Sequence, residues 1–273
     1  MTEEIIDAEI VETADERIER LLRAAKVLIA TPCYGGMCTA DYMRSMTGIA
    51  ALSARFGINI SIITTTNESL VHKARNSLTS QFMNGDFTHI MFIDADVSFN
   101  PDDVLKLILR DKDMVAGLYP LKKISWEHLL DYKAETADEL KRAGLTYTYG
   151  KKDDDGKYLD SASLSLTGDS DGLVEADAVA TGFLLIKRVV FEKMFVSTPD
   201  NWYVEPEIGP VHLYWDTSID TETKQFIGED WTFCSNWRAL GGKIYVDPSI
   251  HLVHTGTYAF EGKLLSTKDS NLN

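Results

Sequence analysis

Hydrophobic positions from residue 26 onward alternate between short continuous runs and longer stretches with helical spacing. The runs at residues 27–30, 58–63 and 90–93 predict buried strands, and the stretches at 40–56 and 69–83 predict the helices between them. Strands that alternate with helices in this way are typical of βαβ units with a parallel sheet. The first part of the chain is therefore expected to form a βαβαβ series.

The pattern continues less regularly in the second part of the chain. Asn100 and Pro101 predict the start of a further helix, because asparagine caps helices well and proline suits the first turn. A strand is expected at 114–118, after which residues 121–171 are polar, with short alternating pieces at 158–166, and predict an insertion or a lid. Further strands are expected at 183–186, 243–246 and 250–253, and a helix at 230–240 that ends at Gly241 and Gly242.

The composition disfavours two classes of binding partner. Of 273 residues, 44% are hydrophobic and 25% are charged, which is typical of a globular chain, and the formal net charge is −15. This charge disfavours a nucleic-acid surface or an anionic membrane as the main partner, because both need clustered lysine and arginine. Three cysteines without a CxxC pair fit a reducing cytosol. Without an apolar run of about 20 residues or a signal-peptide pattern, we expect a soluble cytoplasmic protein with no transmembrane segment.

Two aspartates one residue apart, Asp94 and Asp96, directly follow the apolar run at 90–93. Unpaired buried carboxylates are costly, so a divalent cation is their most common justification at such a position. Ligands in open α/β sheets bind beyond the carboxyl ends of the strands, so segments 31–36, 64–67 and 94–96 are expected to share one crevice. Gly35 and Gly36 belong to neither a GxGxxG nor a P-loop motif, which weakens dinucleotide-binding and P-loop interpretations.

Several ordered blocks together resemble one known family, the GT-A class of nucleotide-sugar glycosyltransferases, in particular its family-2-like group. The blocks are residues 74–76, 92–96 with 101–102, 181–183, 228–230 and 251–256, and the likeness covers roughly residues 25–260. The resemblance implies a GT-A α/β fold, with a mixed, mainly parallel sheet flanked by helices. It also implies a division into a nucleotide-binding half at 25–120, an insertion at 121–172 and an acceptor half at 173–260. An acidic segment at 1–24 precedes this domain and a tail at 261–273 follows it.

By the same resemblance, Asp94 and Asp96 form the DxD motif, and His254 completes a site for Mn²⁺ or Mg²⁺. Alternatively, the aspartates form an acidic loop that caps the helix at Pro101, and His254 is an ordinary structural histidine. His251, three residues earlier, is expected to face the other side of an extended strand.

The resemblance also implies the residues around the donor, a nucleotide diphosphate sugar for which UDP is the weakly preferred nucleotide. Tyr34 offers an aromatic face for the base, and Arg75 offers a guanidinium for a phosphate or a carboxylate. The donor-side candidates are Thr31, Pro32, Tyr34, Asn67, Arg75, Asn76, Asp94 and Ala95. Arg75 and Asn76 are equally well explained as residues that tie their helix to the Asp94 loop.

The catalytic candidates are Asp230 and Glu229, of which Asp230 is the expected base that accepts a proton from the acceptor hydroxyl. Acidic residues in the first turn stabilise any helix, so an ordinary structural role is the alternative. Thr181, Gly182 and Trp231 are expected on the acceptor side, where the acceptor is a glycan or glycoconjugate.

The leading hypothesis is a metal-dependent glycosyltransferase, with inversion favoured over retention. A nucleotidyltransferase or metal-dependent phosphohydrolase is a second hypothesis, because similar sheets also place paired aspartates on cations. A non-catalytic binding protein for sugar nucleotides or carbohydrates is a third. The oligomeric state cannot be inferred from the sequence.

Overall fold

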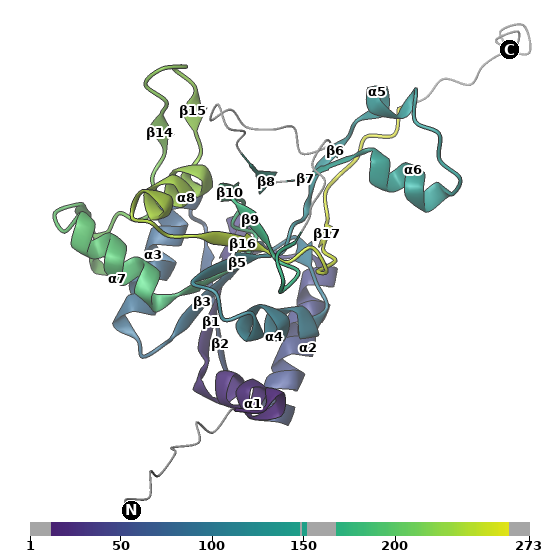
Figure 1. Cartoon of the computed structure of the whole chain (residues 1–273). Helices are drawn as coiled ribbons and strands as arrows, with labels where there is room; N and C mark the ends of the chain where they lie inside the picture. Colours follow the sequence, from purple (N-terminus) through teal and green to yellow (C-terminus); the bar gives the residue numbers. More distant parts are fainter. Residues whose placement is uncertain (1–11, 148, 152–167, 262–273) are drawn as a thin grey trace, which may run out of the picture.

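The computed structural model describes residues 12–147, 149–151 and 168–261. Its centre is a seven-stranded sheet with the order β2-β1-β3-β11-β5-β16-β9 (Figure 1). The strands are β1 (Lys26–Cys33), β2 (Asn59–Thr66), β3 (His89–Ile93), β5 (Met114–Ala116), β9 (Val174–Ala176), β11 (Phe183–Lys187) and β16 (Ile244–Val246). The pairings make β11 and β9 antiparallel to their neighbours, whereas the other strands share one direction.

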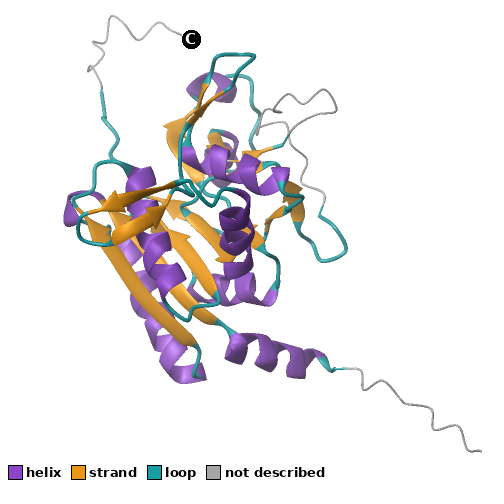
Figure 2. Ribbon diagram, turned by 90° about the vertical axis from the view of Figure 1, so that its left-hand side faces the viewer, coloured by secondary structure: helices purple, strands orange, loops and turns teal. Residues whose placement is uncertain are grey.

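Helices cover both faces of the sheet (Figure 2). One hydrophobic cluster holds side chains of α3 (Val71–Asn84), α7 (Arg188–Ser197) and α8 (Glu229–Ala239), and the other holds side chains of α2 (Ala40–Phe56) and α4 (Pro101–Leu109). Successive residues of β1 alternate between the two, since Leu28 belongs to the first cluster and Val27 and Ile29 to the second. The predicted fold class, an α/β domain with a mixed and mainly parallel sheet flanked by helices, is confirmed.

Smaller elements surround this core. An arm, made of residues 120–147, extends from the sheet as a pair of strands with two short helices between them, and β17 lies beside β6 at its base (Figure 1). These elements are η1 (Tyr34–Gly36), β4 (Val97–Ser98), β6 (Pro120–Ile124), α5 (Trp126–Leu129), α6 (Ala137–Ala143), β7 (Leu145–Tyr147), β8 (Tyr149–Gly150), β10 (Ala178–Val179), β12 (Trp202–Glu205), β13 (Gly209–His212), β14 (Ser218–Ile219), β15 (Phe226–Ile227) and β17 (Val253–His254).

Most of the predicted elements are present with bounds shifted by a few residues. The helix expected at 40–56 is α2, and Asn100 caps α4 by accepting a hydrogen bond from the backbone N–H of Asp102 at 3.2 Å. The acidic segment at 1–24 contains a helix that we did not predict, α1 (Ala14–Ala24), which Thr13 and Glu16 cap reciprocally. The alternating pieces expected at 158–166 lie outside the described residues.

The strand predicted at 250–253 is wrong for its first three residues. Ile250 and Leu252 are buried while His251 is exposed, which reproduces the period of a strand. Asp247, however, accepts hydrogen bonds from the backbone and hydroxyl groups of Ser249, and this turn leads the chain away from the sheet. Both edges of β16 are already paired, with β5 and β9, so no edge of that strand is open to the segment.

Among the described residues, no helix combines the length and the apolar character that crossing a membrane would require.

Candidate functional site

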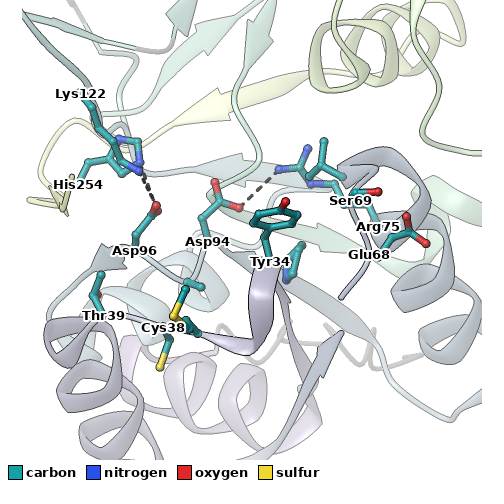
Figure 3. Close-up of a pocket in the computed structure, with 14 residues that line it drawn as sticks. Tyr34, Cys38, Thr39, Glu68, Ser69, Arg75, Asp94, Asp96, Lys122 and His254 are labelled. Carbon is teal, nitrogen blue, oxygen red and sulfur yellow. Dashed lines mark hydrogen bonds and ion pairs between the residues drawn. The ribbon is translucent and has the colours of Figure 1, made fainter. Parts of the chain in front are cut away.

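A cavity of about 570 Å³ lies where β1 and β3 end (Figure 3). Of the three segments predicted to share a crevice, 31–36 and 94–96 contribute to its lining, whereas 64–67 does not. Its lining combines carboxylates, two basic side chains, an imidazole and the exposed ring of Tyr34. The lining residues are Pro32, Tyr34, Met37, Cys38, Thr39, Glu68, Ser69, Val71, Arg75, Asp94, Ala95, Asp96, Lys122 and His254.

The exposed half of the site consists of Asp96, Lys122 and His254 (Figure 3). Nε2 of His254 lies 3.3 Å from one carboxylate oxygen of Asp96, and the ammonium of Lys122 donates to the other. Burial raises the pKa of Asp96, but the contacts with His254 and Lys122 outweigh it and hold the pKa below its ordinary value. Asp96 is therefore a carboxylate at neutral pH.

A hydrogen bond to the backbone fixes the orientation of the His254 ring. Its Nδ1 donates a hydrogen bond to the backbone carbonyl of Pro120 at 2.8 Å, which leaves Nε2 facing Asp96. A carboxylate and an imidazole Nε2 are suitable donors for Mn²⁺ or Mg²⁺, so these two residues fit the implied cation. Within the described ranges, no cluster of three or more His, Cys, Asp or Glu side chains could hold a metal, so further ligands would have to come from substrate or water.

The second half of the site, called the buried half after Arg75, consists of Arg75, Glu229 and Asp230 together with Asp94, whose side chain is 29% exposed and lines the cavity. Arg75 donates a hydrogen bond to Glu229, and its other terminal nitrogen lies 3.5 Å from Asp94. Burial opposes the charge of Arg75, but Asp94, Glu229 and Asp230 together raise its pKa above the usual value. The guanidinium thus stays charged and links the end of β3 to the start of α8.

Asp230 differs from its neighbour Glu229. Glu229 accepts a hydrogen bond from Arg75, whereas a carboxylate oxygen of Asp230 accepts the backbone N–H of Trp231 at 2.9 Å. Burial, and then the negative charge of Glu229, raise the pKa of Asp230 above its ordinary value. A carboxylate with a raised pKa is a better proton acceptor than an ordinary one, which is the property that a general base needs. Neither Glu229 nor Asp230 lines the cavity directly.

A side chain at position 182 would have to displace the side chains of Asp94 and Tyr119. The carbonyl of Gly182 accepts the backbone N–H of Asp94 at 3.1 Å, and its own N–H donates to the Tyr119 hydroxyl at 3.1 Å. A Cβ at this position would lie 2.6 Å from an Asp94 carboxylate oxygen and 2.5 Å from the Tyr119 hydroxyl. The glycine therefore lets β11 approach the Asp94 side chain. Next to it, the hydroxyl oxygen of Thr181 is buried and has no hydrogen-bond partner within the described part of the chain.

The predicted donor-side residues divide into two groups. Pro32, Tyr34, Arg75, Asp94 and Ala95 line the cavity, whereas Thr31, Asn67 and Asn76 do not. Thr31 is buried and its hydroxyl shares a 2.6 Å hydrogen bond with that of Tyr42, so its side chain belongs to the core.

Asn76 is a structural residue in the described chain. Its amide donates to the carbonyl of Trp215 at 2.7 Å and accepts the backbone N–H groups of Tyr214 and Trp215 at 2.9 Å. Asn76 thereby ties α3 to the segment before β14 and satisfies backbone groups that would otherwise be buried unpaired. Asn67 has a positive φ of 61°, a conformation that asparagine tolerates better than most residues, and so shapes the turn after β2.

The aromatic residues of the second half also differ in role. Trp215 is fully buried, and its ring stacks on that of Phe233 with centroids 3.9 Å apart, so it is part of the core. Trp231 is partly buried and packs against both hydrophobic clusters. Its expected contact with an acceptor remains a prediction.

Sequence reasoning missed several residues of the cavity. Met37, Cys38 and Thr39 follow η1 at the end of β1, and Glu68, Ser69 and Val71 follow β2, so the rule that ligands bind beyond strand ends could have identified them. Lys122 carried no comparable signal, because its position depends on the pairing of the arm with β17.

No protein-family model matches this sequence, and no curated protein sequence matches it. Solved structures show distant similarity. The crystal structure of A197 from STIV has a TM-score of 0.46 and 16% identity, covering 85% of this chain and 86% of that one. The crystal structure of GalNAc-T7 with UDP, GalNAc and Mn²⁺ has a TM-score of 0.47 and 12% identity, with coverage of 84% and 44%.

The crystal structure of S. aureus TarS 1–349 has a TM-score of 0.38 and 13% identity, with coverage of 84% and 60%. This chain thus spans less than half of the GalNAc-T7 chain and three fifths of the TarS chain. At these values the function has to be argued from the residues of the site itself.

Proposed function

We propose that this protein is a metal-dependent GT-A glycosyltransferase that moves a sugar from a nucleotide diphosphate sugar to an acceptor hydroxyl. The single observation that supports the proposal best is the arrangement of carboxylates around one cavity. Asp96 pairs with a histidine at its exposed half, while Asp94 is linked through Arg75 to the acidic pair at the start of α8. The sequence blocks that resemble the family thus include both halves of the site.

On the donor side, Asp96 and His254 would hold Mn²⁺ or Mg²⁺. When bound, the cation supplies positive charge that neutralises the diphosphate and stabilises the departing nucleotide. Tyr34 is 75% exposed at the rim of the cavity, so its ring is free to stack on the base. We expect a UDP-sugar first among the possible donors.

On the acceptor side, Asp230 would take the proton of the attacking hydroxyl, with Trp231, Thr181 and Gly182 nearby. Its raised pKa supports this role, and the engagement of Glu229 by Arg75 argues that Glu229 orients the network instead. We infer an inverting reaction on a glycan or glycoconjugate, with residues 25–120 mainly serving the donor and 173–260 the acceptor. Three free cysteines are consistent with a reducing cytoplasmic location.

The proposal is tested by calorimetric titration of the protein with UDP-, GDP- and dTDP-sugars, with and without Mn²⁺, followed by detection of released nucleotide and transferred sugar. We expect one donor to bind in a Mn²⁺-dependent way, and Asp96→Ala to abolish this binding. Asp102→Ala is the matched control, since Asp102 is an exposed aspartate on α4 outside the cavity.

Absence of binding across the panel would contradict the proposal and favour a nucleotidyltransferase or phosphohydrolase, for which nucleoside triphosphates are the next substrates to test. Tight donor binding without sugar transfer, unaffected by Asp230→Asn, would instead indicate a non-catalytic binding protein.

A further inference from the structure

Lys122 is a residue of the cavity to which neither the sequence motifs nor the proposed function gives a role. It lies on β6, at the base of the arm, and its ammonium donates to Asp96 at the mouth of the cavity (Figure 3). The two side chains are 39% and 35% exposed, so their ion pair is open to solvent and can exchange.

The ion pair engages the carboxylate on which the proposed cation depends. Nε2 of His254 faces one oxygen of Asp96 and the ammonium of Lys122 contacts the other. A divalent cation placed between Asp96 and His254 would therefore lie close to a positive charge, and the two would repel each other. This repulsion favours a movement of Lys122 away from Asp96 when the cation binds.

The charges of the cavity indicate where the ammonium would go. Arg75 and Lys122 are the only lysine or arginine side chains in the described lining. The guanidinium of Arg75 is already engaged by Asp94 and Glu229 in the buried half. Once a cation replaces Lys122 on Asp96, Lys122 is thus the basic group of the lining that can neutralise an anionic ligand. Lysine is a common partner of phosphate groups.

The backbone around Lys122 permits this movement. A Cβ on Gly256 would lie 2.6 Å from Cδ of Lys122, so the glycine leaves room for the lysine stem against the segment that follows β17. The four-carbon stem of lysine is flexible, and its head can swing over several ångströms without any change in the backbone. Residue 256 is therefore a place where a larger side chain would restrict the path of Lys122.

We propose that Lys122 exchanges partners during donor binding: before the cation and the donor bind it pairs with Asp96, and it donates to the diphosphate of the donor when the divalent cation occupies Asp96 and His254. This inference rests on the proposed function. It assigns Lys122 as a donor-binding residue, and it explains why a basic side chain from the arm reaches the DxD segment.

The test compares two affinities that the proposal moves in opposite directions. The first is the affinity for Mn²⁺ alone, measured by electron paramagnetic resonance of free Mn²⁺. In Lys122→Met the competing ammonium is gone, so Mn²⁺ should bind about two- to fivefold more tightly, the range expected for a solvent-exposed ion pair.

The second affinity is that for UDP, GDP and dTDP at saturating Mn²⁺, measured by titration calorimetry. For the nucleotide that binds the wild type, Lys122→Met should weaken binding about tenfold or more, as expected for loss of a hydrogen bond to a charged group. Lys122→Arg keeps the charge and should restore most of this affinity. Lys123→Met is the matched control, because Lys123 is the next residue of β6 and does not line the cavity, and it should leave both affinities unchanged.

The possible failures are distinguishable. If Lys122→Met leaves nucleotide affinity at saturating Mn²⁺ equal to that of the wild type, the exchange is contradicted while the proposed function stands. If wild-type protein binds neither Mn²⁺ nor any of the nucleotides, the proposed function fails, and the inference fails with it. Circular dichroism and thermal melting of each variant exclude misfolding as the cause of a changed affinity.

Discussion

The two halves of the site differ in how their charges are held. In the buried half, the side chain of Arg75 is only 6% exposed and contacts carboxylates from two distant segments. In the exposed half, Asp96 and Lys122 are each more than one third exposed, and their contacts are shared with solvent. The buried charges therefore depend on the fold and contribute to it, whereas the exposed charges are available for exchange with ligands.

This difference suggests that the two halves of the site have separate roles. A network that is fixed by folding can adjust the pKa of a carboxylate beside it: in addition to burial, the charge of Glu229 raises the pKa of Asp230, and the charge of Arg75 lowers it. In the proposed reaction a cation and a diphosphate would enter and leave in every cycle, and weakly held partners such as Lys122 suit that requirement. The following experiments should separate the two halves, beginning with the largest expected effect.

Replacing the base candidate should affect the reaction most. In Asp230→Asn we expect sugar transfer to fall by about 10²- to 10⁴-fold, because general base catalysis is lost, while donor affinity stays close to that of the wild type. Initial rates at saturating donor, together with calorimetric donor affinity, measure the two effects. Asp102→Asn, also in the first turn of a helix, is the control and should retain full activity. An Asp230→Asn enzyme with an unchanged rate would remove the base assignment.

Replacing Arg75, the positively charged side chain of the buried half, should lower the free energy of unfolding. Arg75→Met leaves Asp94 and Glu229 close together without their shared partner, and we expect the free energy of unfolding to fall by about 3–5 kcal/mol. Urea denaturation measures this change. Lys73→Met on the same helix removes more exposed ion pairs with Glu68 and Glu205 and should lower the free energy of unfolding by much less than Arg75→Met does. Equal losses in the two variants would contradict the distinction between the halves.

Replacing His254, the metal-ligand candidate of the exposed half, should affect Mn²⁺ binding more than folding. His254→Gln is expected to weaken Mn²⁺ binding by about tenfold or more, since changes even in groups around a metal often have effects of that size. Its melting temperature should stay close to that of the wild type. The control is His251→Gln, because His251 is exposed and lies outside this cavity. Identical Mn²⁺ affinities for both variants would place the cation elsewhere.

The smallest expected effect concerns the pH dependence of stability. The pKa of Asp230 is higher in the folded protein than the ordinary aspartate value, so the folded state holds its proton more tightly than the unfolded state does. Ionised Asp230 therefore destabilises the fold at neutral pH, and Asp230→Asn should be slightly more stable there. The gain should disappear as the pH falls below the ordinary aspartate pKa. Urea denaturation of both proteins between pH 3 and 8 tests this, and a gain that persists at pH 3 would contradict it.

The main strands and helices of the central sheet could be predicted because the pattern that indicates each one lies within its own segment of the sequence. The run at 90–93 is uninterrupted and apolar, and the helix at 40–56 has helical spacing and ends before Gly57, which adopts a positive φ of 66°. The position of Asp94 and Asp96 at the end of β3 followed from the same run. The strand expected at 250–252 is absent from the described chain because this segment has the alternating burial of a strand but no partner strand.

The contacts that complete the site could not be predicted, because they join residues far apart in the sequence. Arg75 and Glu229 are separated by 154 residues, and nothing local to either indicates the other. Lys122 and Asp96 are only 26 residues apart, yet their contact depends on how the arm leaves the sheet and pairs with β17. Resemblance to a family suggested Arg75 and Asp96 separately, but only the folded chain shows which charges neutralise which.

The position of β11 also has a consequence for how the chain matures. This strand lies antiparallel between β3 and β5. One edge of β3 pairs with β1, and the backbone hydrogen bonds of its other edge are made with residues 183–187. During synthesis, the first three strands emerge long before their partner does, and an unpaired apolar edge is prone to association with other chains. We expect the early part of the nascent chain to require protection until β11 has left the ribosome, and a chain cut before residue 183 to aggregate.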